Sequence, residues 1–284
     1  MASLRDIRKH IDSVKSIKQI TYAMKMVAAV RYRKAYVNLV ANRPYKQDME
    51  MLMRDLASKK PDNYNHIYFT APEKAGRELL VVITSDKGLC GSFNSTLLKN
   101  CLKFLKAGTV PVDIITIGKK GKDYLTHRGF KSMKHYSGVM NKLQYSGITD
   151  IMEDVLKNYK TKQYRSVNII FNEFKIVTQA KTKNFTLLPV SIAGYSGVKS
   201  EFIFEPDVET LLEKLLPRYL GVIFYGILLE SNAAEQGLRM TSMEQATKNA
   251  DDMMKKLTLI YNQTRQASIT KELSDLVGGA AAVS

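Results

Sequence analysis

The sequence contains no tryptophan, and only two of its 284 residues are cysteines, Cys90 and Cys101. Two cysteines cannot build a disulfide framework or a structural zinc site. Cys101 is expected on a helix that starts soon after Cys90. The two Cα atoms should therefore lie farther apart than the roughly 4.4–6.8 Å that a disulfide needs. We expect two free thiols, as is usual in a reducing compartment.

Long apolar runs are also missing. No stretch of about 18 apolar residues is present, and charges throughout Met1–Lys18 leave no apolar core for a secretory signal. Hydrophobic residues nevertheless make up 45% of the chain, enough to form a sizeable core in one large domain or two ordinary ones. We expect a protein that does not insert into a membrane.

Acidic residues are scarce near the amino end. Residues 1–46 carry eleven Lys or Arg and two acids, and the whole chain has a net charge of +16. This imbalance predicts an acidic partner, which could be nucleic acid, an anionic membrane or an acidic protein surface. The sequence shows no catalytic triad, paired carboxylates or histidine ligand spacing. We expect no cofactor and no metal.

Helical periodicity dominates the first segment, residues 4–56. Its apolar residues follow a 3-4-3 rhythm, interrupted by two steps of three at Val14, Ile17 and Ile20. These steps predict a stammer, a local overwinding of a coiled coil. Pro44 predicts a kink or a break. An unbroken helix of this length would measure about 80 Å.

A second long helix is predicted from Asp207, a good N-cap residue, to the end of the chain. Pro217 should kink or break it, and Gly278-Gly279 is the first strong stop signal. Two long helices at opposite ends of a chain are most simply antiparallel, with their apolar stripes buried against each other. The second helix would then overhang the first at 260–277.

The middle of the chain alternates strands with helices. Such alternation predicts a mostly parallel sheet covered on both faces, a Rossmann-like α/β domain. The expected strands are 78–84, 112–117, 167–174 and 185–190, and the expected helices are 92–106, 119–127 and 148–159. The domain boundaries are an N-terminal coiled-coil helix 1–58, a linker 59–75, the α/β domain 76–206 and a C-terminal coiled-coil helix 207–284.

Two glycine-containing loops follow predicted strands, Ser85–Ser92 and Gly118–Lys122. Such loops can bind phosphate on the amides of the next helix, but neither has the spacing of a known nucleotide motif, so tight structural turns are favoured. The residues alone leave open a nucleic-acid-binding coiled-coil protein and a nucleotide-binding enzyme that uses the Gly88–Gly91 turn.

Four stretches carry a family resemblance. They are the Ile7–Ala29 helix, Ser85-Asp86-Lys87-Gly88-Leu89-Cys90-Gly91, Phe204–Asp207, and the tail that runs from Tyr261-Asn262-Gln263-Thr264-Arg265 through Leu273 to Val277-Gly278-Gly279-Ala280-Ala281. In this order and over the whole length, the sequence resembles the F-type ATP synthase gamma subunit of the bacterial type. The regulatory cysteine insertion of the chloroplast type is absent, so thiol control is not expected.

The resemblance implies a non-catalytic central rotor shaft. Its implied partners are a hexamer of alpha and beta subunits, the epsilon subunit and the membrane c-ring, with no nucleic acid. It implies a peripheral position at the cytoplasmic face of a bacterial inner membrane. Proton-driven rotation of the ring would turn the shaft, and the shaft would change the conformation of catalytic sites on the beta subunits.

Matching the family also implies contact residues. Bearing contacts to beta are expected at the far end of the second helix, and an acidic lever of beta is expected beside the first. A foot should meet the c-ring and epsilon. The implied residues are Arg265, Gln266 and Thr270 for the bearing, Met24 and Lys25 for the lever, and Arg43, Tyr45, Phe202, Phe204 and Glu205 for the foot.

Overall fold

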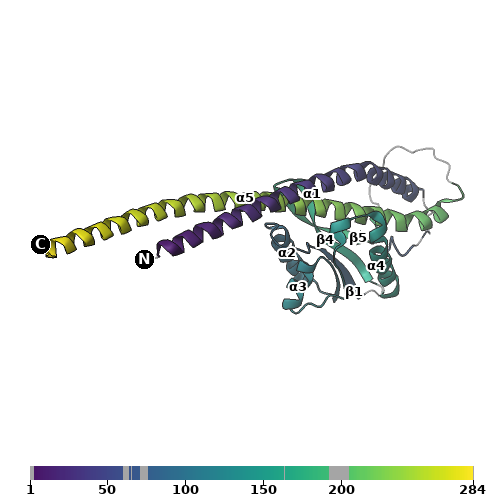
Figure 1. The fold of residues 1–284 in the computed structure, drawn as a ribbon. Coiled ribbons are helices and arrows are strands. Elements are labelled where there is room, and N and C mark those ends of the chain that lie inside the picture. Colours follow the sequence, from purple (N-terminus) through teal and green to yellow (C-terminus); the bar gives the residue numbers. More distant parts are fainter. Residues whose placement is uncertain are drawn as a thin grey trace. The chain divides into compact units, whose positions relative to one another are not determined.

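The structure is a computed structural model that describes residues 3–59, 64, 66–70, 76–162, 164–191 and 205–283. The chain divides into two compact units. The coiled-coil unit combines Met1–Ala29 with Met240–Ser284, and the sheet unit is Val30–Arg239. The first helix, α1 (Leu4–Ser58), and the last, α5 (Val208–Val283), each contribute to both units (Figure 1).

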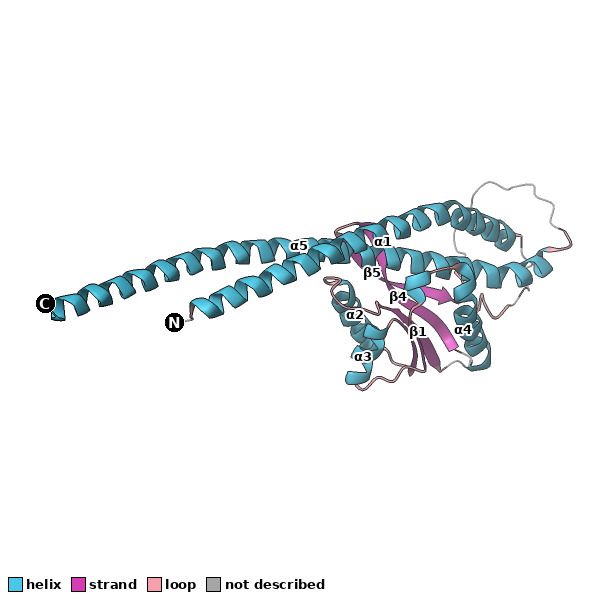
Figure 2. Cartoon of the chain, in the orientation of Figure 1, coloured by secondary structure: helices cyan, strands magenta, loops and turns pink. Residues whose placement is uncertain are grey.

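The sheet unit is built on five strands in the order β3-β2-β1-β4-β5. Strands β3, β2, β1 and β4 run parallel to one another, and β5 runs antiparallel to β4 (Figure 2). The predicted mostly parallel sheet is therefore confirmed. The strands are β1 (Arg77–Ile83), β2 (Val112–Ile117), β3 (Lys134–Tyr136), β4 (Tyr164–Ile176) and β5 (Gln179–Leu188).

Three helices connect the parallel strands, α2 (Phe93–Ala107), α3 (Lys119–His127) and α4 (Thr149–Lys162), with short 3-10 turns at Val139–Lys142 and Tyr145–Ile148. The sequence missed β3, because three residues with no aliphatic side chain carry no strand pattern. It also started β5 too late, since most of that strand is exposed and polar.

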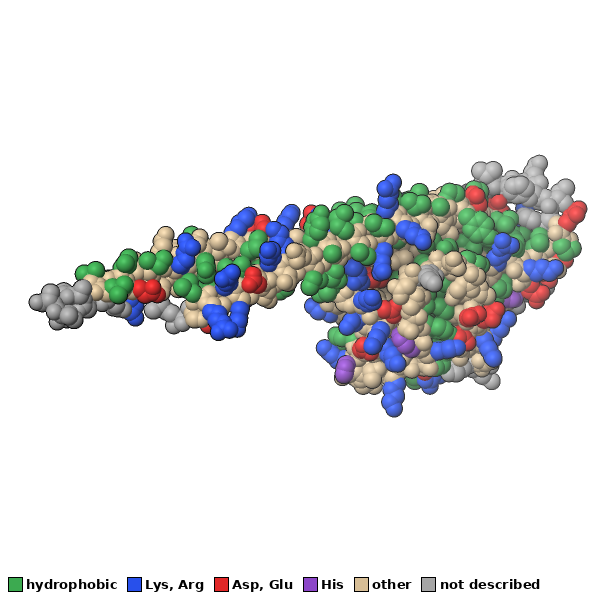
Figure 3. Space-filling model, in the orientation of Figure 1, with side chains coloured by type: hydrophobic (Ala, Val, Ile, Leu, Met, Phe, Trp, Pro, Cys, Tyr) green, Lys and Arg blue, Asp and Glu red, His purple; other side chains and the backbone are tan. Residues whose placement is uncertain are grey.

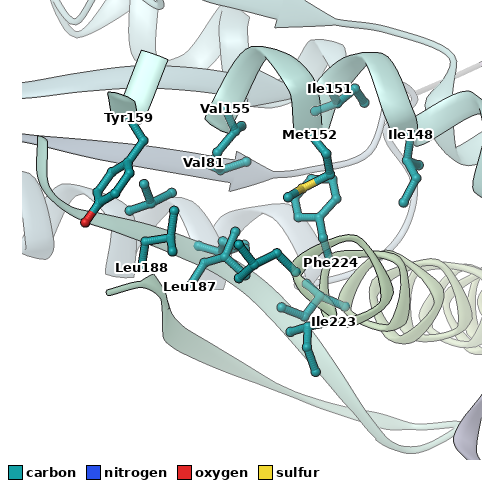
Figure 4. Close-up of a cluster of buried hydrophobic side chains, with 14 of the residues drawn as sticks. Val81, Ile148, Ile151, Met152, Val155, Tyr159, Leu187, Leu188, Ile223 and Phe224 are labelled. Atoms are coloured by element: carbon teal, nitrogen blue, oxygen red, sulfur yellow. The ribbon is translucent and has the colours of Figure 1, made fainter. Parts of the chain in front are cut away.

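Both faces of the sheet are covered, and β1 shows how the sequence divides between them. Leu80 and Val82 join the core beneath α2 and α3, whereas the alternating Leu79, Val81 and Ile83 join the core on the other face. That second core includes α4 and buried residues of α1 and α5, among them Met53 and Phe224. Figure 4 shows Met152 of α4 and Phe224 of α5 in this core. Alternation along a strand thus fixes which helix each residue supports.

Neither proline breaks its helix. Helix α1 continues through Pro44 and α5 through Pro217, so a break at either position is excluded. A proline inside a helix costs about 3 kcal/mol because it removes a hydrogen bond and crowds the preceding turn. Burial offsets that cost on both helices, since Met49 and Met53 follow Pro44 and Leu216 precedes Pro217 in the core.

The predicted stop at Gly278-Gly279 is wrong. Helix α5 runs on to Val283. Glycine weakens a helix by roughly 1 kcal/mol compared with alanine but does not terminate it by itself. The next three residues are alanines, the best helix formers, and they favour continuation.

The ends of β1 and β2 are joined at Thr84. Its hydroxyl donates to the carbonyl of Ile117 at 3.1 Å and accepts from the amide of Gly121 at 2.8 Å. Gly118 has a φ of +92°, and a Cβ there would lie 2.0 Å from the Thr84 carbonyl oxygen. Only glycine fits this position without moving the strand end.

Replacing Gly118 by alanine should therefore destabilise the sheet unit strongly, by about 3 kcal/mol or more, because the strained φ and the clash add together. Urea unfolding followed by circular dichroism measures this loss. Gly147→Ala is the matched control, since its Cβ would meet nothing within 4 Å. Equal stabilities of the two variants would contradict the packing described here.

Candidate functional site: the coiled-coil seam and the end of the last helix

The seam of the coiled-coil unit keeps a strict alternation of steps of three and four on both helices. On α1 it passes from Val14 to Lys18 and Thr21, and Ile17 and Ile20 are 49% and 60% exposed. The predicted stammer is therefore wrong. The apolar pattern followed Ile17 and Ile20, whereas the seam crosses two polar positions. Its members are Leu4, Ile7, Ile11, Val14, Lys18, Thr21, Lys25 and Ala28 on α1, and Met240, Met243, Thr247, Ala250, Met254, Leu257, Tyr261, Thr264 and Ser268 on α5.

Polar contacts in the middle of the seam fix its direction. The Thr247 hydroxyl donates to the Thr21 hydroxyl at 2.9 Å. On either side, Lys18 pairs with Asp251 at 2.5 Å and Lys25 pairs with Glu244 at 2.9 Å. Moving forward along α1 therefore moves backward along α5, and the antiparallel arrangement predicted from the sequence is confirmed.

The two ion pairs shift the acids in the direction that stabilises the charged form. A hydrogen bond from Lys25 lowers the pKa of Glu244, and one from Lys18 lowers the pKa of Asp251. A carboxyl whose pKa falls on folding adds stability above its ordinary pKa, near 4, and that stability is lost as the pH drops through the lowered value. The two ion pairs therefore favour this register at neutral pH.

Charge reversal tests this register. Lys18→Glu puts two carboxylates together and should lower the melting midpoint of the helices by a few degrees, whereas adding Asp251→Lys should restore most of the loss. Circular dichroism at low salt measures both variants. Lys15→Glu, an exposed position on the same helix, controls for the change in net charge. If the double variant melts no higher than Lys18→Glu alone, the pairing is disproved.

The far end of α5 extends past the start of α1. Continuing the register places Leu4 opposite Thr264, and Tyr261, Thr264 and Ser268 are still half-buried. The overhang therefore begins after Ser268, later than the expected start at residue 260. From Ile269 to Val277 every side chain whose exposure is described is exposed, and four of these are large and apolar: Ile269, Leu273, Leu276 and Val277.

The expected bearing residues lie at the boundary of this overhang, with Arg265 and Gln266 just before it and Thr270 within it. Arg265, Gln266 and Thr270 are all exposed on α5. The Thr270 hydroxyl donates to the carbonyl of Gln266 at 2.9 Å within the helix, so its oxygen remains able to accept a bond from outside. The structure brings the three residues within two turns of one helix.

The other expected contact residues are spread along the chain. Met24 is half-buried and Lys25 is already bonded to Glu244. Arg43 and Tyr45 are exposed on α1, and Glu205 is exposed before α5. Phe202 and Phe204 lie outside the described residues. Figure 3 shows basic and hydrophobic side chains both reaching the surface of the paired helices in the coiled-coil unit.

The loop at Gly118–Lys122, which could have bound phosphate, is occupied by internal contacts. Asp86 accepts a hydrogen bond from the amide of Lys119, and the next two amides of α3 donate to Ser85 and Thr84. The first turn of α3 is thus satisfied by the chain itself, and a carboxylate sits where an anion would bind. These contacts favour a structural turn.

Sequence reasoning missed Arg239, which binds the other phosphate-loop candidate. Its guanidinium donates to the carbonyls of Lys87 and Gly88 and pairs with the buried Glu235. The available signal was an acid and a base four residues apart on α5, Glu235 and Arg239. Sequence reasoning also missed the polar part of the seam. Its signal was that the alternation of steps of three and four continues through Lys18, Thr21 and Lys25.

The described ranges hold neither a metal cluster nor a membrane-spanning helix, and both cysteines in them are free. There, no three His, Cys, Asp or Glu side chains come together as a metal site requires. Each described helix is too short or too polar to serve as a membrane span. Cys90 and Cys101 are free, as predicted. Both are buried, and burial raises the pKa of the Cys101 thiol to about 12.

Comparisons with known proteins agree on one family. A family model described as ATP synthase matches residues 3–283. The ATP synthase gamma chains of Cytophaga hutchinsonii and Prosthecochloris aestuarii are 40% and 39% identical and cover 100% of this chain and 99% of their own. The cryo-EM structure of the Tetrahymena thermophila mitochondrial ATP synthase central stalk/c-ring matches with a TM-score of 0.60 and 26% identity, covering 80% of this chain and 99% of that one.

Proposed function

The chain belongs to the ATP synthase gamma chain family and is a central shaft of that rotary enzyme. From this premise we propose that its role is mechanical and that it carries no catalytic site of its own. Alpha and beta subunits would surround the coiled-coil unit, and epsilon and the c-ring would contact the foot. We place the assembly at the cytoplasmic face of a bacterial inner membrane, with the shaft peripheral to it.

The observation that carries this proposal is the end of α5. A helix that extends beyond its partner and exposes Leu273, Leu276 and Val277 is expected to be covered by another protein, because a contiguous apolar surface is unfavourable in water. Mostly nonpolar contact suits a bearing. Strong directional bonds would hold the shaft at one angle, whereas nonpolar contacts vary little with rotation.

We retain Arg265, Gln266 and Thr270 as the polar contacts of this bearing. Met24 and Lys25 are the proposed contacts to the acidic lever of beta. The Lys25 side chain is 30% exposed while paired with Glu244, so its charge would be shared between the two helices and the lever. Arg43, Tyr45, Phe202, Phe204 and Glu205 remain the proposed foot.

Reconstitution tests the proposal. The purified chain, mixed with alpha and beta subunits of the same organism, should form a stoichiometric complex whose ATPase activity exceeds that of the subunits without it. A complex that forms under the same conditions with an established gamma chain, but not with this chain, would disprove the shaft role.

The bearing has its own test. Replacing Arg265, Gln266 and Thr270 together by alanine should leave the melting of the free chain unchanged, because all three are exposed, but should lower complex formation or ATPase activity several-fold. Lys256→Ala with Thr258→Ala is the matched control on the paired part of α5, since the Thr258 hydroxyl makes the same bond within the helix. Equal activities of the two variants would rule out the assigned bearing.

A further inference from the structure

A buried charge pair lies at the last turn of α5 within the sheet unit. Arg239 is 9% exposed and Glu235 is 5% exposed, and the guanidinium is bonded to the carboxylate. The boundary between the two compact units falls directly after Arg239. The pair is therefore situated where α5 passes from the sheet unit into the coiled-coil unit.

The guanidinium binds two kinds of acceptor at once. Besides Glu235 on its own helix, it donates from Nη1 to the carbonyl oxygen of Gly88 at 2.7 Å and from Nη2 to that of Lys87 at 3.4 Å. A planar fork of donors can hold a carboxylate and a loop simultaneously, which a single ammonium group cannot do with the same geometry. Arg239 thus ties the helix to the loop after β1.

The loop is in turn fixed to the sheet. The Ser85 amide donates to the side chain of Asn94 on α2 at 3.1 Å, and the Ser85 hydroxyl donates to the Lys87 carbonyl at 2.7 Å. Asp86 accepts from the amides of Lys119 and Gly138. A twist that reaches Lys87 is therefore passed to α2, α3 and the central strand.

Small residues of α5 pack against nonpolar side chains around the clamp. Ala234 packs against Cys90 and Phe93, and Ala233 packs against Ala35 and Leu39 of α1. Alanine presents a small, smooth surface, and hydrophobic contact has no preferred direction. Arg239 adds directional bonds at this turn.

A buried ion pair of this kind is not expected to stabilise the fold more than an apolar pair of similar size would. Burial raises the pKa of Glu235 even though the adjacent guanidinium opposes the shift. Desolvation of two charges cancels much of their attraction, and apolar pairs of similar size are often at least as stable. Its advantage over such a pair is geometric.

We propose that Arg239, oriented by Glu235, is the positioning residue that locks α5 to the Lys87–Gly88 loop and so transmits twist between the coiled coil and the sheet unit. This inference rests on the shaft role proposed above.

Two variants separate positioning from stability. Arg239→Lys keeps the charge beside Glu235 but loses the fork to the loop carbonyls. The double variant Glu235→Met with Arg239→Met removes both charges, leaves no unpaired group and keeps the buried volume filled. Arg218→Lys, an exposed arginine on the same helix, is the matched control.

The readout is torsional stiffness in the complex with alpha and beta subunits. The complex is fixed to a surface, and a bead is attached through a cysteine introduced at the exposed Lys122; Cys90 and Cys101 are buried and do not compete for the label. The angular variance of the bead is measured while the motor pauses with nucleotide bound, and the melting midpoint is measured on the free chain.

Both clamp variants should raise the angular variance by about twofold or more, while the control stays at the unaltered value, because a single ammonium or a thioether cannot fix the loop as the fork does. The double variant should melt close to the unaltered chain. An unchanged angular variance in Arg239→Lys overturns the proposal. If Arg239→Lys does not assemble, an unchanged angular variance in the double variant overturns it instead. Failure of the unaltered chain to form the complex would instead reject the shaft role.

Discussion

Every other feature of this chain depends on one constraint, which is that the two terminal helices keep a single side-chain register against each other. In the coiled-coil unit that register is a strict alternation of three and four, and it passes through Lys18, Thr21 and Lys25 without changing step. In the sheet unit the same helices pack small residues together, with Ala35 of α1 close to Ala233 of α5. A slip by one helical turn would have to disrupt both sets of contacts at once, which makes the register cooperative.

The polar middle of the seam makes its register specific. Purely apolar seams tolerate sliding, whereas the Thr21–Thr247 bond and the flanking Lys–acid pairs can be satisfied only in one alignment. Placing lysine in the seam also leaves Ile17 and Ile20 on the outside, where they are 49% and 60% exposed. The exposed apolar surface of α1 is therefore a consequence of how the register is specified, and it is available to a partner protein.

The sequence predicted the elements better than it predicted the seam. Long periodic helices and unbroken apolar strands such as β1 are set by local pattern, so the α/β unit and the two terminal helices could be read directly. The three-residue β3 carries no such pattern. The stammer was inferred because apolar residues alone were counted, and polar seam residues are recognised only once the partner helix is known. The contact residues at 265–270 came from family resemblance, because an exposed Arg or Gln has no local signature of its partner.

The two ways of joining α5 to its surroundings suit opposite mechanical needs. At the far end, exposed aliphatic side chains from Ile269 to Val277 offer contact that changes little with angle, which is what a turning surface requires. At Arg239, directional hydrogen bonds to a loop anchored at Ser85 and Asp86 oppose rotation of the helix within its own body. A shaft needs low friction where it turns against its neighbours and no slip where it joins the part that drives it. Nonpolar and charged contacts on one helix meet these two requirements separately, and that separation explains why a costly buried ion pair is kept at the point where α5 leaves the sheet unit.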